Sequence, residues 1–188
     1  MSTEISELLE AAAPVVSGVA RGIPDDRLGA PTPCAEFRVR DLLNHLLQVT
    51  TNFQALAHRK DVDWSAGPDR LTGDWRAALD DDLARLGENW SDPAALDGVS
   101  PGMGLPQRTL GQMLLADLVV HGWDLAAATG QPYQVPAALL DATAEFLDVM
   151  AETGRTMGAF GPEVAAPEGA DRLEQLLART GRDPRWRP

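Results

Sequence analysis

The chain has 188 residues, with 16 Lys and Arg against 28 Asp and Glu, which gives a formal net charge of −12 at pH 7. A negative charge of this size repels phosphate backbones, so the composition disfavours nucleic-acid binding. The single cysteine excludes an internal disulfide, and no apolar run reaches the roughly 20 residues that a membrane-spanning helix needs. A chain of this length suits one domain over residues 1–188. Since no basic-then-apolar leader precedes it, we expect a cytoplasmic protein with no membrane contact.

The first half of the chain predicts three helices joined by irregular connections. Apolar residues recur at helical spacing in residues 1–20, 39–59 and 70–89. The proline-rich stretch 22–34 and the polar stretch 61–72 are typical of connections. His45 falls at the edge of the apolar side of the second helix, so its ring can point into the protein interior.

The second half of the chain contains its most apolar stretch, residues 110–130. This stretch has no proline and ends at Gly130, which is typical of a helix that finishes on a glycine cap. Asp117 and His121 lie one turn apart on its apolar stripe. Two further helices are expected at 136–152 and, shorter, at 171–179, whereas the Pro- and Gly-rich segment 90–106 predicts a long connection.

These patterns predict an all-α protein: a four-helix bundle with a short extra C-terminal helix and almost no strand. Its interior is expected to be a single core. The residues predicted to be buried there are Leu42, Leu46, Leu114, Leu118, Leu125, Phe146 and Leu147.

The carboxylate and the imidazole on the apolar stripe of the 110–130 helix need an explanation. Burying an unpaired carboxylate is costly, whereas Asp117 and His121 can each give one ligand to the same cation. In helix bundles such sites are built from inward side chains on facing helices, which is where His45 would also lie. Spacing alone leaves two interpretations open: a metal site formed by these three residues, or polar core residues that are hydrogen-bonded to one another. The remaining histidine, His58, is expected to be exposed.

Two residues close to this group are given structural roles. The chain neighbours of Cys34 supply no positive charge that would lower its pKa, so we interpret it as a buried structural thiol rather than a nucleophile. Asp124, just beyond His121, is expected to make a hydrogen bond that supports the site or the end of the helix.

Several motifs of the chain together resemble one known family. They are TPC at 32–34, VRDLLNH at 39–45, DLVVHGWDLA at 117–126 and GRDP at 181–184. This combination is similar to the metal-binding proteins of the DinB/YfiT-like superfamily, in the branch related to the N-terminal domain of mycothiol-dependent maleylpyruvate isomerase. The resemblance extends over nearly the whole chain, and VHGWDLA is its most specific part.

The resemblance implies a bundle of up-down-down-up type with a divalent metal, zinc or nickel, at one end of its core. The ligands it implies are a histidine early in the second helix and a Glu-x-x-x-His pair on a later helix. Carried onto this sequence, they are His45, Asp117 and His121. Aspartate in place of glutamate is one methylene shorter, which puts direct ligation by Asp117 in question.

The function implied by the resemblance is chemistry on a small thiol. Three protein ligands leave a position open on the metal, and in the related enzymes it receives a low-molecular-weight thiol such as mycothiol. We therefore expect a metal-dependent thiol transferase or isomerase that acts on a small thiol and an electrophile. Asn44, Gln48 and Arg108 are candidate wall residues that would bind an anionic substrate.

The chain also departs from the isomerases. Those enzymes carry an additional C-terminal domain for which this chain has no room, and this disfavours maleylpyruvate itself as the substrate. The alternative function is a non-catalytic module that binds a metal or a small ligand, and a homodimer is among the assemblies left open.

Overall fold

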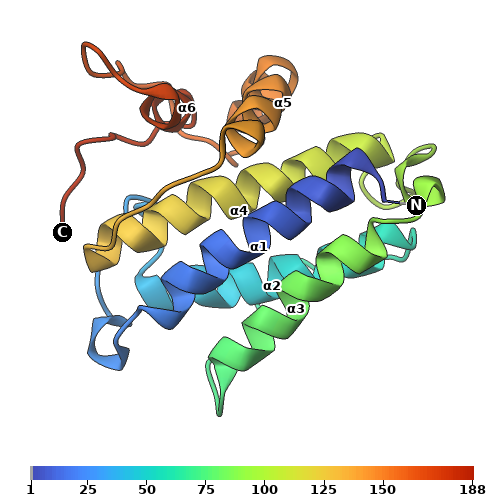
Figure 1. Ribbon diagram of the computed structural model, residues 1–188, viewed down its shortest axis with the longest axis horizontal. Helices are drawn as coiled ribbons and strands as arrows, with labels where there is room; N and C mark the ends of the chain where they lie inside the picture. Colours follow the sequence, from blue (N-terminus) through green and yellow to red (C-terminus); the bar gives the residue numbers. More distant parts are fainter. Residues whose placement is uncertain (1) are drawn as a thin grey trace.

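A computed structural model describes residues 2–188, and all regular structure in that range is helical (Figure 1). Met1, which the sequence assigned to the first helix, lies outside the described residues. The predicted all-α class is confirmed. The long helices are α1 Glu4–Arg21, α2 Val39–Ala57, α3 Trp75–Asn89, α4 Gln107–Thr129 and α5 Ala137–Thr156, and the shorter ones are α6 Arg172–Arg179 and the 3-10 turns η1 Asp25–Arg27 and η2 Pro93–Leu96.

The helix ends follow local capping chemistry. Helix α3 begins later than the predicted residue 70, because the side chain of Asp74 accepts a hydrogen bond from the backbone N–H of Ala77 and caps the helix there. Helix α4 ends as predicted, with Gly130 in the left-handed conformation at φ 69°. The connection 90–106 contains the η2 turn and an isolated antiparallel bridge between Val99 and Pro106.

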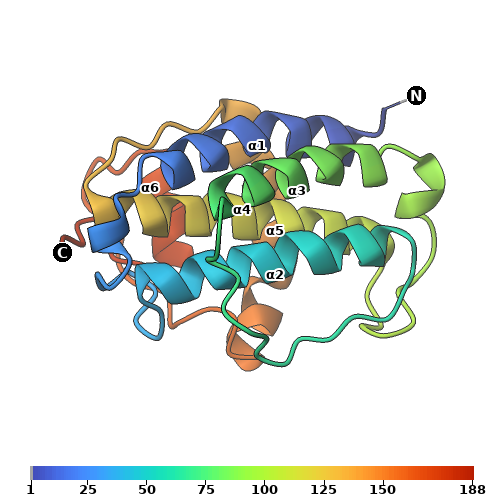
Figure 2. The same cartoon turned by 90° about the horizontal axis from the view of Figure 1, so that it is seen from below.

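Helices α1 to α4 form the bundle. Helix α1 contacts α3 and α4, and α2 also contacts α3 and α4, so α1 lies diagonally opposite α2. The connection between α2 and α3 runs back along the bundle in Figure 2, so these two helices point the same way. Helices α2 and α4 run in opposite directions, which brings the start of α2 and the end of α4 together near the C-terminus of the chain (Figure 2).

Helix α5 is a fifth long helix and does not belong to the four-helix bundle. It packs with α6 on the outer side of α4 (Figure 1). Helix α4 is therefore covered by the bundle on one side and by α5 on the other, which explains why its sequence is apolar almost all round.

The core consists of two clusters instead of the single one predicted. All seven residues predicted to be buried are at most 3% exposed. Phe146 and Leu147, however, belong to a second, smaller cluster between α4, α5 and α6, together with Ala116, Ala151 and Leu176. The second cluster exists because α5 buries its apolar side against the outside of α4 and not inside the bundle.

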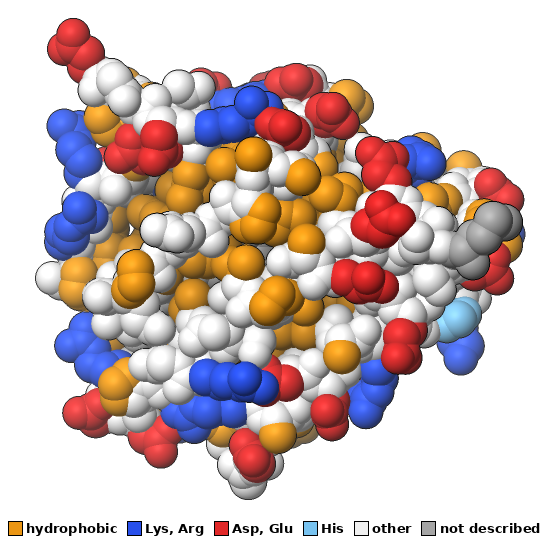
Figure 3. All heavy atoms as spheres, viewed as in Figure 1, with side chains coloured by type: hydrophobic (Ala, Val, Ile, Leu, Met, Phe, Trp, Pro, Cys, Tyr) orange, Lys and Arg blue, Asp and Glu red, His pale blue; other side chains and the backbone are white. Residues whose placement is uncertain are grey.

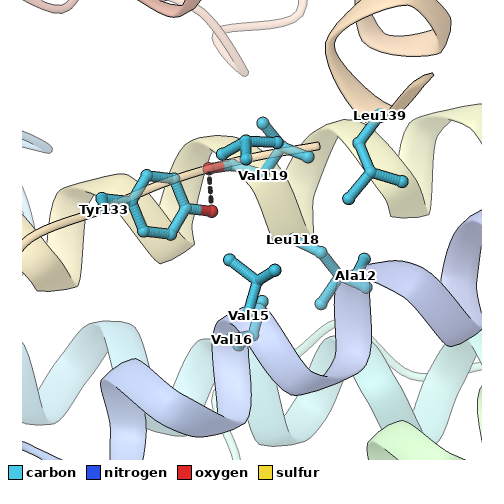
Figure 4. A pocket seen from close by; sticks show the side chains of 8 residues that line it. Ala12, Val15, Val16, Leu118, Val119, Tyr133 and Leu139 are labelled. Atoms are coloured by element: carbon cyan, nitrogen blue, oxygen red, sulfur yellow. Dashed lines mark hydrogen bonds between the residues drawn. The ribbon is translucent and has the colours of Figure 1, made fainter. Parts of the chain in front are cut away.

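A shallow apolar hollow lies between α1, α4 and the chain that connects α4 to α5. Figure 4 shows Val15 of α1 opposite Tyr133, whose hydroxyl donates a 2.8 Å hydrogen bond to the carbonyl of Val119. An adjoining hollow of about 290 Å³ is lined by Gly18 of α1 and residues 131–134. In the space-filling view the middle of this face is largely apolar (Figure 3). None of the helices in residues 2–188 combines the length and the apolarity that crossing a bilayer demands.

Candidate functional site

The rings of His45 and His121 meet at the end of the bundle where α2 begins and α4 ends. Their centroids are 5.1 Å apart and their planes are nearly perpendicular, at 84°. Phe37 stacks on His45 at 5.5 Å. The Thr32 hydroxyl donates a 2.7 Å hydrogen bond to the Phe37 carbonyl, and the Phe37 N–H donates a 2.8 Å bond to the carbonyl of Cys34. The TPC segment therefore positions the aromatic ring that packs on His45.

Asp117 lies one turn before His121 on α4 and completes the predicted group. Its Oδ1 is 4.0 Å from Nε2 of His121, which is too long for a hydrogen bond. The Asp117 side chain is 29% exposed and that of His121 is 9% exposed. The group is thus open to solvent on the Asp117 side and enclosed behind His121.

On the buried side of His121, the ring nitrogen Nδ1 is held by the ion pair between Asp124 and Arg182. Nδ1 of His121 is 2.9 Å from Oδ2 of Asp124, which confirms the supporting hydrogen bond predicted for that residue. The Asp124 side chain is 0% exposed, and Arg182 donates to both of its oxygens, over 3.1 Å to Oδ2 and 3.4 Å to Oδ1. Because a carboxylate only accepts hydrogen bonds, Nδ1 of His121 is the donor in this contact, and Nε2 lies on the other side of the ring, 4.0 Å from Oδ1 of Asp117.

Arg182 belongs to the GRDP motif at 181–184, but its role at the site was not predicted from the sequence. It follows α6, where Gly181 adopts φ 85° and ends the helix in a Schellman motif, with Gly181 N–H bonded to Ala178 carbonyl and Arg182 N–H to Leu177 carbonyl. This turn directs the arginine back to α4. A glycine after a short helix does signal the helix end, but no sequence pattern links an arginine to an aspartate 58 residues earlier.

The environment shifts the pKa of two side chains at the site. Burial lowers the pKa of His45, and the neighbouring His121 lowers it further, while the charge of Asp117 acts in the opposite direction. Burial also raises the pKa of the Cys34 thiol, against the lowering effect of Arg182. Cys34 thus does have a positive neighbour, supplied by a distant part of the chain, but burial has the larger effect and favours the neutral thiol.

The residues present suit a divalent cation in kind. Two imidazoles and a carboxylate are ligands that zinc and nickel accept. Two donors that each lie about 2.1 Å from one tetrahedral ion are about 3.4 Å apart, so the 4.0 Å between Asp117 and His121 would have to shorten. Over residues 2–188, no group of three or more His, Cys, Asp or Glu side chains is already placed to hold a metal ion. A site with His45, Asp117 and His121 therefore requires these side chains to adjust, and metal ligation by them stays a prediction.

The predicted substrate-binding residues have partners within the chain. Asn44 and Gln48 donate hydrogen bonds of 3.0 and 2.8 Å to the 61–72 connection. Arg108 forms a 3.1 Å ion pair with Glu4 at the start of α4, at the opposite end of that helix from His121. Their role towards a substrate stays a prediction.

Sequence comparison places the chain among known proteins. A family model described as "Mycothiol maleylpyruvate isomerase N-terminal domain" matches residues 9–126. The chain belongs to this family. The resemblance predicted from the motifs is thereby confirmed. The matched segment contains His45, Asp117, His121 and Asp124, whereas Arg182 lies beyond it.

Two proteins from strains of Mycobacterium tuberculosis, Uncharacterized protein MT0763 and Uncharacterized protein Rv0738, are similar over most of their length. Each is 30% identical to this chain over 164 residues, which cover 84% of this chain and 86% of the relative. No solved structure matches the chain at a significant level. The family is therefore established from sequence.

Proposed function

We propose that this protein binds a divalent metal ion, zinc or nickel, through His45, Asp117 and His121, and that it acts with a low-molecular-weight thiol such as mycothiol in a transferase or isomerase reaction. The observation that carries the proposal is the fixed orientation of His121. Its Nδ1 is bound to the buried Asp124 at 2.9 Å, so Nε2 is left on the side of Asp117, whose Oδ1 is 4.0 Å away.

The protein groups around the site suit this role. The low pKa of His45 keeps its imidazole neutral near pH 7, and only a neutral imidazole can ligate a metal. The partly exposed Asp117 marks the side from which a thiol can approach. A bound divalent metal would supply a Lewis acid that ionises a coordinated thiol near neutral pH. The neutral Cys34 thiol would compete weakly, because the thiolate is the reactive form.

Metal titration followed by thermal unfolding tests the proposal. Zinc or nickel at about 100 times its dissociation constant should stabilise the folded state by roughly 2.7 kcal/mol, which corresponds to a rise in Tm of about 5 to 11 °C for a chain of this size. The variants His121→Ala and His45→Ala should abolish this rise. Elemental analysis before and after chelation measures the bound metal directly.

The third histidine provides a matched control. His58 is exposed and its Nε2 contacts Asn89 Oδ1 at 2.5 Å, at the end of α2 far from His45. His58→Ala should keep the full metal response. A Tm that does not change with either metal in the unmodified protein, or a response that His58→Ala removes as completely as His121→Ala, contradicts the assignment.

Activity is tested on the metal-loaded protein by following mycothiol consumption in the presence of an electrophile. Turnover should disappear in His45→Ala together with the metal, and Cys34→Ser should retain most of it. The opposite result, with activity lost in Cys34→Ser and kept without metal, would assign the nucleophile to the protein. Metal binding without turnover of any thiol or electrophile would instead favour the non-catalytic binding module.

A further inference from the structure

We propose that Arg182 is a positioning residue of this site: by fixing Asp124, it holds the His121 ring with Nδ1 bound to that carboxylate and Nε2 on the side of Asp117. The metal that Nε2 would bind rests on the proposed function. The orientation of the ring is a property of the metal-free protein and can be measured without it.

The contacts of Asp124 show why a second residue is needed. Its Oδ2 accepts from both His121 Nδ1, at 2.9 Å, and Arg182, at 3.1 Å, while its Oδ1 accepts from Arg182 alone, at 3.4 Å. A two-pronged contact of this kind fixes the plane of a carboxylate as well as its position. Because Asp124 is 0% exposed, no bulk water is available to orient the carboxylate if the arginine is absent.

Arg182 itself is not available to a substrate. The residue is 6% exposed, and its third donor group, Nη1, bonds to the carbonyl of Thr180 at 3.1 Å. Its guanidinium is therefore occupied within the chain, and its effect on the site passes through Asp124. The charge pair also satisfies a carboxylate that would otherwise be buried uncompensated next to His121.

The position of Arg182 in the chain makes the site composite. His45 comes from α2 and His121 from α4, but the residue that orients His121 comes from the segment after α6, beyond the family-matched residues 9–126. Ligand affinity at Nε2 should therefore depend on how that segment packs against α4. By linkage, a bound ion should stabilise the packing of the segment in return.

Nitrogen-15 NMR of the histidine rings in metal-free protein, at about pH 8, where a histidine of ordinary pKa is neutral, tests the orientation directly. The unmodified protein should show His121 protonated at Nδ1. Arg182→Met should give a mixture of tautomers and shifted ring resonances, and Arg182→Lys, which keeps the charge but not the two-pronged contact, should lie between the two. If Arg182→Met does not fold, Arg182→Lys decides: His121 resonances identical to those of the unmodified protein overturn the proposal, and shifted ones support it.

A neighbouring arginine gives a matched control. Arg179, also at the end of α6, pairs with Asp148 at 2.8 Å, and Arg179→Met removes an ion pair from the same segment without touching Asp124. This variant should leave the His121 spectrum unchanged. A spectrum that changes equally in Arg179→Met and Arg182→Met would show a general loosening of the segment and would overturn the specific role of Arg182.

Zinc affinity is the second readout. Loss of a residue that orients a metal-ligating histidine weakens binding by about 10- to 100-fold, so Arg182→Met should show this loss, Arg182→Lys a smaller one and Arg179→Met none. Equal zinc affinity in Arg182→Met and the unmodified protein overturns the proposal. If the unmodified protein binds no zinc, the proposed function fails while the NMR comparison still decides whether Arg182 positions His121.

Discussion

The surroundings of His45 favour its neutral form. This residue lies between Phe37, which stacks on it, and the ring of His121, and its pKa is lowered from the ordinary 6.5 mainly by burial. The unfolded chain therefore binds a proton at this residue at a higher pH than the native protein does. Where the unfolded state binds more protons, the free energy of unfolding rises with pH.

Replacement of His45 by glutamine should reduce the acid sensitivity of the fold. The stability associated with neutral His45 is fully present above the unfolded pKa near 6.5 and is lost as the pH falls below it, toward the lower native pKa. His45→Gln does not titrate, so its free energy of unfolding should fall less steeply between pH 6.5 and acid pH than that of the unmodified protein. Urea unfolding at a series of pH values, in chelator, measures the two slopes.

His58→Gln is the appropriate comparison, because it removes a histidine and leaves His45 in place. The part of the pH dependence of the free energy of unfolding that is due to His45 should persist in this variant. Equal slopes for His45→Gln and the unmodified protein would mean that protonation of His45 does not oppose folding.

At the scale of single elements, the end of α6 depends on one glycine. Gly181 has φ 85°, a conformation that disfavours any side chain. A Cβ at this position would also lie 2.8 Å from the Cα of Gly161 in the segment after α5. The backbones at Gly161 and Gly181 thus lie too close together for a side chain at residue 181. This close approach is at the point where the chain turns toward Arg182.

Gly181→Ala should destabilise the protein by more than the usual cost of placing alanine in the left-handed region. Placing alanine in the left-handed region costs about 1 to 2 kcal/mol, and the contact with the Gly161 backbone adds to this, because backbone cannot move aside as a flexible side chain can. Gly169→Ala is a matched control, since Gly169 has φ 73° but open space around its Cβ position. Chemical denaturation should show a larger loss for Gly181→Ala than for Gly169→Ala, and equal losses would mean that the close approach carries no energy.

The elements were largely predictable, because each is specified by local pattern. The apolar periodicity of α2, and the long apolar run of α4 with the glycine after it, determine those helices within a few residues. Asp74 shows the limit: the capping side chain, not the apolar pattern, decides where α3 begins. The location of α5 outside the bundle was not predictable, because an apolar face does not indicate which neighbour will cover it.

For the molecule as a whole, the Asp124–Arg182 pair joins the bundle to the layer formed by α5 and α6. Its side chains are 0% and 7% exposed, so the charges are removed from water on both sides of the contact. Loss of one partner from such a pair leaves the other charge buried and typically costs about 3 to 5 kcal/mol. The pair therefore makes the packing of the outer layer part of the stability of the bundle.

A double-mutant cycle measures this coupling. Arg182→Met alone should lower the free energy of unfolding by about 3 to 5 kcal/mol, because Asp124 keeps its charge without the arginine. The combined variant Asp124→Leu with Arg182→Met should be more stable than the sum of the single changes predicts, by roughly 0.5 to 3 kcal/mol. Additive losses would show that the two residues do not stabilise each other.

The residues of the site differ in how well they could be predicted from the sequence. Asp117 and His121 could be paired because they stand one turn apart on an apolar stripe, and the family resemblance added His45, which lies at the edge of the apolar side of its helix. Asp124 could be predicted as a supporting residue because it is close to His121 in the chain. Arg182 stands in the GRDP motif, but its contact with Asp124 could not be predicted, because it results from packing between segments that are 58 residues apart.

That separation also bears on how the protein is made. Translation runs from the N-terminus, so α4 is synthesised before Arg182, which lies 58 residues after Asp124. A nascent bundle that closes early has to bury the Asp124 carboxylate without its arginine, at a cost of several kcal/mol. The end of α4 that carries His121 is thus favoured to finish packing only after residue 182 has emerged from the ribosome. We therefore expect this end of the bundle to mature late in the folding of the newly made chain.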